Sequence, residues 1–148
     1  MTQFYVPGEP IPQGSKRAYV NRRTNRAVVV EDNPRHRDWR ARVALAARQA
    51  HQGPLIVGPV KLYLFFEFAR PRSHYGTGRN SQFLRASAPQ HKMSKPDLDK
   101  LIRAVCDSLT GIVWLDDCLV VQISARKHWS REPGVLIVVR SNDTAKGE

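Results

Sequence analysis

Four acidic residues stand in two short groups, and their spacing is the most informative feature of the sequence. Asp97 and Asp99 lie in the stretch Lys-Pro-Asp-Leu-Asp, and Asp116 and Asp117 follow Trp-Leu further along. The chain has only 13 acidic residues against 24 Lys and Arg. Carboxylates repel phosphate, so grouping them in a basic protein makes electrostatic sense mainly if a divalent cation separates them from an anionic partner. Mg²⁺ prefers oxygen ligands and can activate water for phosphodiester hydrolysis.

The local backbone decides whether Asp97 and Asp99 can face the same point. In a continuous helix they would lie about 200° apart, at roughly 100° per residue. Pro96 disfavours helix at Lys95, however, and Asp is a favoured N-cap residue, which predicts a helix that begins after an extended Asp97. Alternate side chains of an extended segment point to one side, so both carboxylates are expected to converge.

Purely structural roles, with no catalysis or metal binding, could also explain these acidic residues. Asp97 could be only a helix cap, Asp99 a first-turn charge, and Asp116 and Asp117 a turn before a strand. Lys100 and Arg103 could balance these charges, or one of them could stabilise a phosphate during hydrolysis. The residues alone leave both interpretations open.

The net charge of +11 favours a polyanionic partner. Nucleic acid is the first candidate and an anionic membrane surface the second. No apolar run approaches the ~20 residues of a spanning helix, and the N-terminus lacks a signal-peptide pattern, so a cytoplasmic location is expected. Cys106 and Cys118 are expected to be free, buried and apolar in character. Two Cys and five His match no zinc-ligand spacing.

Hydrophobic periodicity and turn signals predict the elements that position the acids. They comprise strands at 4–6, 60–68, 118–129 and 134–140, a hairpin within 18–30, a helix over 34–51 that Asn33 caps, and a helix over 97–110. The inner face of the first helix is predicted to be Trp39, Val43, Ala46, Ala47 and Ala50. That of the second is predicted to be Leu98, Leu101, Ile102, Val105 and Leu109. This order indicates one α/β (α+β) domain over residues 1–148, with a mixed sheet, two main helices and a short polar tail at 141–148.

Two segments concentrate positive charge without any acid. Residues 16–26 hold five Lys or Arg, and residues 69–96 hold six. The second is a long Pro-, Ser- and Gly-containing loop, so 70–95 is predicted to be mobile without ligand. Phosphate contacts are expected from both segments. The candidates are Lys16, Arg17, Arg22, Arg23, Arg72, Lys92 and Lys95.

The stretch KPDLDKLIRAVCDSLTG followed by IVWLDD is similar to the core motif of the RusA family of Holliday junction resolvases. The opening VPGEPIPQGSKR resembles the start of phage-type members. The similarity runs from the first strand to about Lys127, with residues 69–90 unaligned. It implies a homodimeric endodeoxyribonuclease that uses Mg²⁺, with Mn²⁺ as a substitute, to cut four-way DNA junctions in recombination and repair.

The resemblance also implies residue roles. The family's essential carboxylates fall on Asp97, Asp99 and Asp117, with Asp116 as a secondary acid. Its catalytic lysine falls on Arg103, and its usual Asn falls on Lys100, so either cation could take the lysine's role. The polar loop at Ser15, Lys16 and Arg17 matches a junction-contacting element. A two-fold dimer would supply paired symmetrical cuts. The alternatives are a non-catalytic basic DNA-binding protein and a less selective nuclease of branched DNA.

Overall fold

The computed structural model describes residues 1–14, 16–31 and 34–141. The predicted junction-contacting Ser15, the predicted cap Asn33 and the tail from residue 142 onward therefore lie outside the described residues.

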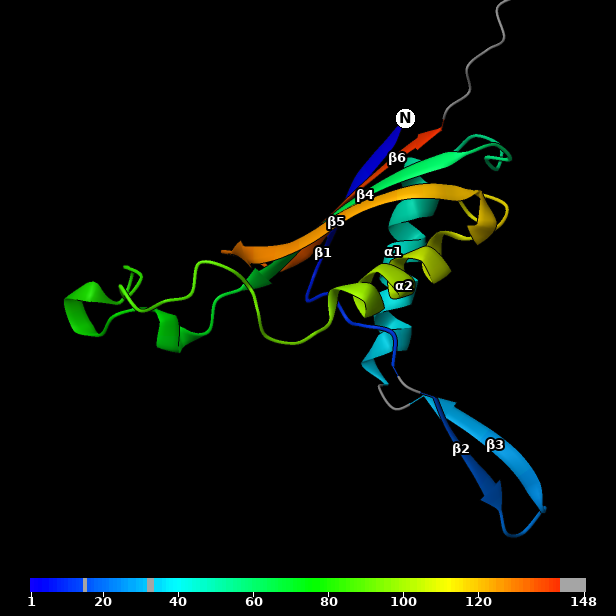
Figure 1. Cartoon of the computed structure of the whole chain (residues 1–148), viewed down its shortest axis with the longest axis horizontal. Helices are drawn as coiled ribbons and strands as arrows, with labels where there is room; N and C mark the ends of the chain where they lie inside the picture. Colours follow the sequence, from blue (N-terminus) through cyan, green and yellow to red (C-terminus); the bar gives the residue numbers. More distant parts are fainter. Residues whose placement is uncertain (15, 32–33, 142–148) are drawn as a thin grey trace, which may run out of the picture.

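A four-stranded mixed sheet forms the centre of the single α+β domain (Figure 1). Its order is β1 (Thr2–Pro7), β6 (Gly134–Ser141), β4 (Val60–Ala69) and β5 (Val120–Ser130). β6 is antiparallel to β1 and to β4, whereas β4 and β5 are parallel. Parallel neighbours need a long crossover, and the chain between them contains the 70–95 segment and the second helix. The topology therefore brings the acidic residues beside the outer strand β5.

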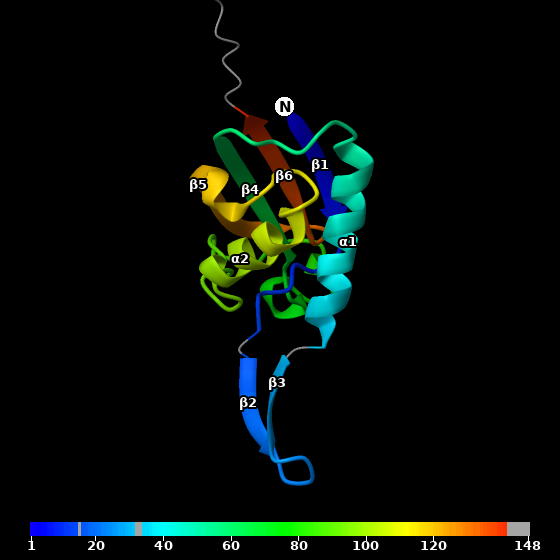
Figure 2. The same ribbon diagram turned by 90° about the vertical axis from the view of Figure 1, so that its right-hand side faces the viewer.

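Strand β4 shows why the sheet has one covered and one open face. Its side chains alternate with period two between full and partial burial. The buried set faces the two helices, which lie on one side of the sheet (Figure 2), and consists of Val60, Leu62, Leu64, Phe66 and Phe68. The core of the domain therefore lies between the sheet and the helices.

Helix α1 (Arg35–Ala50) confirms most of its predicted inner face. Trp39, Val43 and Ala47 are buried and Ala46 is partly buried. Ala50 is exposed, which corrects the prediction, because it is the last residue of the helix and the chain turns away after it. His36 is buried in its place at the other end, one turn before Trp39. Because histidine is a polar residue type, the hydrophobicity pattern did not identify His36 as part of the buried face of α1.

Helix α2 (Leu98–Leu109) agrees with its prediction to within one residue at each end. Leu101, Val105 and Leu109 are fully buried, and Leu98 and Ile102 pack against the core from its margin. The small residues Ala104 and Ser108 complete the buried stripe. The apolar face anchors α2 and leaves the polar face, which carries the acids, toward solvent.

The predicted hairpin is present as a separate two-stranded sheet. β2 (Lys16–Asn21) pairs antiparallel with β3 (Arg26–Glu31), with Tyr19 opposite Val28. It projects away from the main sheet (Figures 1 and 2). Arg22 and Arg23 are exposed in its turn, which places two predicted phosphate contacts at the tip.

The 70–95 segment contains two short 3₁₀ turns, η1 (Arg72–His74) and η2 (Gly78–Asn80). An isolated bridge joins Tyr75 to Leu84. The prediction that this segment is mobile without ligand stays a prediction. No helix of the described ranges 1–14, 16–31 and 34–141 is long and apolar enough to cross a membrane.

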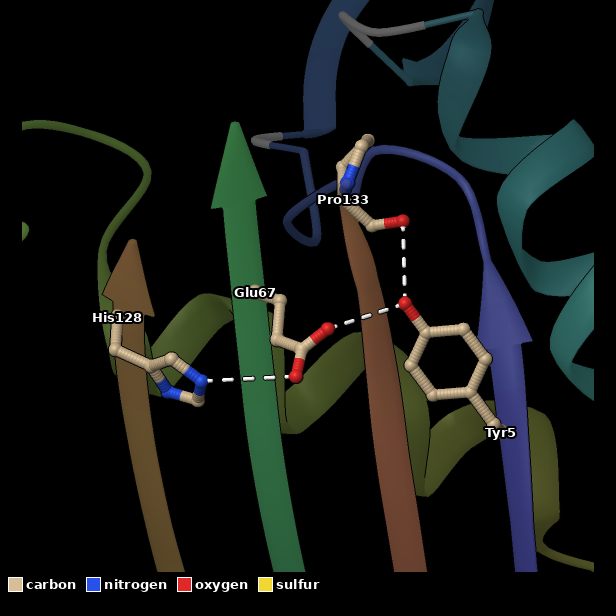
Figure 3. Close-up of polar contacts among 4 residues, drawn as sticks. All are labelled: Tyr5, Glu67, His128 and Pro133. Carbon is tan, nitrogen blue, oxygen red and sulfur yellow. Dashed lines mark hydrogen bonds and ion pairs between the residues drawn. The ribbon is translucent and has the colours of Figure 1, made fainter. Parts of the chain in front are cut away.

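A polar row crosses the open face of the sheet at one end (Figure 3). The Tyr5 hydroxyl of β1 donates to Glu67 Oε2 of β4 at 3.1 Å, and His128 Nε2 of β5 lies 3.7 Å from Glu67 Oε1. Tyr5 reaches Glu67 across β6 at Gly134, where a Cβ would stand 2.0 Å from the Tyr5 hydroxyl. Because Gly134 of β6 has no side chain, Tyr5 of β1 can reach across β6 to Glu67 of β4.

Candidate functional site

Asp97 and Asp99 lie at the exposed start of α2. Asp97 has the extended backbone expected of it, with φ −68° and ψ 136°, and the helix begins at Leu98. Within the described part of the chain, the Asp97 side chain caps no backbone N–H of α2. The simple helix-cap role is thus not realised, and its oxygens stay accessible beside Asp99 in the first turn. The positive end of the helix dipole favours both charges here.

Two cations follow the acids on the same helix. Lys100 Nζ lies 3.7 Å from Asp97 Oδ2, and both side chains are about half exposed. Such a surface pair contributes only ~0–1 kcal/mol to stability, so either member is free to exchange partners. Arg103 is exposed one turn later, four residues after Asp99. Both candidates for the family's lysine role thus lie near the acids.

The N-terminal segment forms one wall of a groove beside Asp97. The Gln13 backbone N–H donates to the Lys100 carbonyl oxygen at 3.0 Å, which fastens this segment to α2. The groove has a volume of about 380 Å³ and is lined by residues 9–14, Arg35, Lys95, Pro96, Asp97 and Lys100. Lys16 and Arg17 follow directly at the start of β2. The described segment that leads into the predicted junction-contacting loop therefore adjoins the N-terminal end of α2.

Two lysines hold the backbone immediately before Asp97. Lys92 Nζ donates to the Lys95 carbonyl at 2.6 Å and to Ser94 Oγ at 2.6 Å. Lys127 Nζ donates to the Pro96 carbonyl at 2.8 Å. Lys92 is only 8% exposed, and its burial lowers the pKa of the ammonium group. Its donors are used inside the protein, so Lys92 is removed from the expected phosphate contacts, whereas Lys95 stays exposed.

Asp116 and Asp117 lie in a turn at the other end of α2. The Cys118 backbone N–H donates to Asp116 Oδ1 at 3.0 Å, and this bond lowers the pKa of Asp116. The turn, η3 (Asp117–Leu119), leaves Cys118 exposed. The prediction that Cys118 is buried is therefore wrong, because it lies in this turn before β5 begins. Both cysteines are free, as expected, and Cys106 is partly buried.

Asp117 is oriented by the end of α2. Its Oδ1 accepts a hydrogen bond from Trp114 Nε1 at 3.2 Å and another from the Thr110 hydroxyl. Trp114 is fully buried, so it ties the exposed carboxylate to the core. Sequence reasoning missed Thr110 and Trp114 as supports of Asp117; the spacing Trp-x-x-Asp within one turn was the available signal.

The three predicted metal ligands do not meet within one chain. Asp97 is the N-cap of α2, and Asp117 contacts Thr110, its C-cap. Twelve helical residues at ~1.5 Å each separate these ends by about 18 Å. Correspondingly, the described residues contain no group of three or more His, Cys, Asp or Glu placed to hold one ion. The expectation of a three-carboxylate site is therefore not met by a single subunit.

Comparison with known proteins decides the family. The family model "Endodeoxyribonuclease RusA" matches residues 7–140. The chain belongs to the RusA family. The match includes both acidic groups, the groove segment from Pro7 onward and all of the 70–95 segment. "Uncharacterized protein YqaN" of Bacillus subtilis (strain 168) is 30% identical to this RusA-family chain over 141 residues, which are 93% of this chain and 94% of that protein.

Family membership confirms the resemblance seen in the sequence and gives the exposed acids a chemical context. RusA proteins are endodeoxyribonucleases. A nuclease needs both a basic surface and groups that promote phosphodiester hydrolysis. In this RusA-family chain the acids stand at the two ends of α2, where Lys100 pairs with Asp97 and where Thr110 and Trp114 donate to Asp117. The arrangement fits nuclease chemistry provided that the two ends can be brought together.

Proposed function

We propose that the protein is a Mg²⁺-dependent endodeoxyribonuclease that resolves Holliday junctions by paired symmetrical cuts. The observation that carries this proposal is the pair Asp97 and Asp99. Both are exposed at a helix start, and Asp97, which makes no cap bond in the described structure, lines a groove together with Lys95 and Lys100. Membership of the RusA family supports the same chemistry. A cellular role in DNA recombination or repair follows from the proposed substrate.

The donor set suits Mg²⁺. Exposed carboxylates are the hard oxygen ligands that this ion prefers, and a site with few carboxylates leaves room for its waters. Asp97, Asp99 and Asp117 would hold the ion, with Mn²⁺ as a substitute. When bound, the ion supplies charge neutralisation at the phosphate and lowers the pKa of a water molecule. Lys100 or Arg103 offsets the negative charge that grows on the phosphate, and the groove orients the strand beside Asp97.

We further propose that the active site is shared between two subunits of a homodimer. The two ends of α2 are about 18 Å apart along the helix, so Asp117 cannot share one metal ion with Asp97 and Asp99 of the same chain. A two-fold arrangement of antiparallel α2 helices would place the C-terminal end of each helix against the N-terminal end of the other. Asp97 and Asp99 would then meet Asp117 of the partner subunit. Such a dimer contains two equivalent sites, which is what paired cuts on opposed strands require.

Mixed dimers test both proposals together. Asp97→Asn and Asp117→Asn should each abolish cutting as homodimers while leaving junction binding intact or tighter, because a repulsive charge is lost. A heterodimer of the two variants, isolated by two different affinity tags, contains one site with both substitutions and one intact site. It should nick one strand of a four-way junction at about half the wild-type rate per dimer. Two sites that each lie within one chain would leave this heterodimer inactive.

The substrate and the metal are tested by direct comparison. Purified protein is incubated with a four-way junction, a linear duplex and a single strand, each with Mg²⁺ or EDTA. Metal-dependent symmetrical nicks in the junction alone support a resolvase. Binding without cutting would indicate a non-catalytic DNA-binding protein, and equal cutting of other branched substrates would indicate a less selective nuclease.

A further inference from the structure

Both ends of the 70–95 segment, called the basic arm below, close on one aromatic ring. Trp129 of β5 has the Arg70 guanidinium carbon 5.4 Å from its ring and the Lys92 ammonium 4.9 Å from it. The His74 ring meets the same indole edge-on, with centroids 5.0 Å apart. Arg70 also donates to the Pro89 carbonyl at 2.7 Å, which joins the outgoing and returning chain. The arm therefore leaves the domain from a packed base.

The far end of the arm is closed by its own hydrogen bonds. The Gly76 N–H donates to the Phe83 carbonyl at 3.0 Å, and the Arg85 N–H donates to the His74 carbonyl at 2.8 Å. The Arg85 guanidinium donates to the Tyr75 carbonyl at 2.7 Å. A Cβ on Gly76 would stand 2.7 Å from the Asn80 backbone, so this turn packs too closely for any side chain. The tip of the arm therefore has a defined, hydrogen-bonded structure.

The surface of the arm combines exposed apolar side chains with unopposed positive charge. Phe83 is 67% exposed and Leu84 is 50% exposed, beside each other at the tip. Arg72 and Arg79 are also exposed, and the sequence from 70 to 95 contains no acid. The arm points away from the main sheet (Figure 1), so these side chains meet solvent in the isolated subunit. An aromatic ring among cations is the combination with which proteins contact unstacked bases and their phosphates.

We propose that the basic arm docks on the junction beside its branch point, with Phe83 against an unstacked base and with Arg72 and Arg79 on neighbouring phosphates. The inference rests on the proposed function, since it assigns a part of the same substrate to a second surface. The returning end of the arm leads directly to Asp97, and Lys92 and Lys127 fasten that connection. An arm that recognises the branch point and is fastened next to Asp97 would thereby set where the acids meet the DNA strand. Duplex DNA offers Phe83 no unstacked base, so the arm would favour branched DNA.

The test measures binding in EDTA, so that it does not depend on cutting. A four-way junction carries 2-aminopurine beside the branch point, and a linear duplex carries the same label. Wild-type protein should raise the fluorescence of the junction, because the labelled base leaves its stack with the neighbouring bases. Phe83→Ala should lose most of that rise and bind the junction about tenfold more weakly, which is the size of one base–aromatic stacking contact. Its duplex affinity should stay within about twofold of wild type.

Two further variants complete the experiment. Phe83→Trp keeps an aromatic face and should keep the junction affinity. Leu45→Ala removes a side chain of similar exposure, 56%, from the outer surface of α1 and should change neither reading. Junction binding by Phe83→Ala that equals that of Leu45→Ala would overturn the proposal. A change in oligomeric mass caused by Phe83→Ala would also overturn it, because the ring would then be a subunit contact.

The outcomes separate the arm from the nuclease. Phe83-dependent binding of the junction by a protein that never cuts in Mg²⁺ would support the arm and overturn the proposed activity. Cutting of junctions at unchanged affinity by Phe83→Ala would overturn the arm and support the activity.

Discussion

Lys92 and Lys127 donate to the same backbone oxygen, the Ser94 carbonyl, at 3.3 Å and 2.7 Å. Two ammonium groups this close repel each other, and Lys127 indeed contributes to the lowered pKa of Lys92. Carbonyl oxygens of residues 94–96 offset the repulsion, and the rings of Phe68 and Trp129 lie 5.0 and 4.9 Å from Lys92. The result is a fixed backbone immediately before Asp97. We infer that the two lysines position this carboxylate.

Lys127→Met should loosen the segment while keeping the length of the side chain. Hydrogen bonds from a charged donor contribute roughly 1.5–3 kcal/mol when buried, and the partial exposure of Lys127 reduces this to about 1–2 kcal/mol of unfolding free energy. Cutting should fall about tenfold and the half-saturating Mg²⁺ concentration should rise, since a misplaced ligand costs binding as well as rate. Lys127→Arg keeps a donor and should restore most of both. An unchanged Mg²⁺ dependence in Lys127→Met would assign the residue to stability alone.

Lys100→Ala should lower the cutting rate more than Arg103→Ala. Lys100 Nζ is 3.7 Å from Asp97 and lines the groove, whereas Arg103 lies a turn further along α2. A positioned positive charge at a phosphate is typically worth 10²–10³-fold in rate, so we expect roughly a hundredfold loss for Lys100→Ala. Single-turnover cutting at saturating protein separates this loss from weaker DNA binding. A larger loss for Arg103→Ala would show instead that Arg103 takes the place of the family's lysine.

Gly134→Ala should destabilise the sheet without touching the acids. The new methyl group would stand 2.0 Å from the Tyr5 hydroxyl and 2.9 Å from the Val6 carbonyl, so Tyr5 must leave Glu67 and β1 must shift. Steric changes of this kind cost typically 1–3 kcal/mol, measured as a lower midpoint in urea. Tyr5→Phe removes only the hydrogen bond and should cost ~1 kcal/mol or less. Equal stability of Gly134→Ala and wild type would show that the strand adjusts freely.

The raised pKa of the Cys106 thiol predicts that the protein loses stability in alkali. Burial raises its pKa to about 12 from an ordinary value of 9.0, with smaller contributions from Asp117 and Asp107. Because the folded pKa is the higher one, this contribution is fully present below pH 9 and is lost as the pH rises from 9 towards 12. At pH 10 the unfolded thiol is mostly ionised and the folded thiol is not, which lowers the unfolding free energy by about 1 kcal/mol.

Comparison with Cys106→Ala isolates this thiol from other groups that titrate in alkali. The difference in unfolding free energy between wild type and Cys106→Ala should narrow by about that amount between pH 8 and 10. A difference that does not depend on pH would contradict the assignment. In native protein at pH 8, a thiol reagent should modify the exposed Cys118 before Cys106, and Cys118→Ser should remove the faster reaction.

The elements that carry the site were predictable because their signals are local. Pro96 followed by Asp97 predicts where α2 begins, and the spacing of Leu101, Val105 and Leu109 predicts which side of it is buried. Period-two alternation predicts the two faces of β4 in the same way. The bounds of the helices and the hairpin follow from turn and cap residues within a few positions. The RusA motif in turn contains both acidic groups within one stretch of the chain.

Long-range relations were decided only by the tertiary structure. No local pattern indicates that Lys92 turns inward onto Trp129, since a lysine in a polar loop is usually solvated. Nor does spacing reveal that α2 itself holds Asp117 away from Asp97 and Asp99, because separations of 20 and 18 residues are compatible with contact or with opposite ends of a helix. Sequence periodicity reports which way a side chain faces along its own element. Which residues meet across elements depends on how the helices and strands pack, and that is settled by the three-dimensional fold.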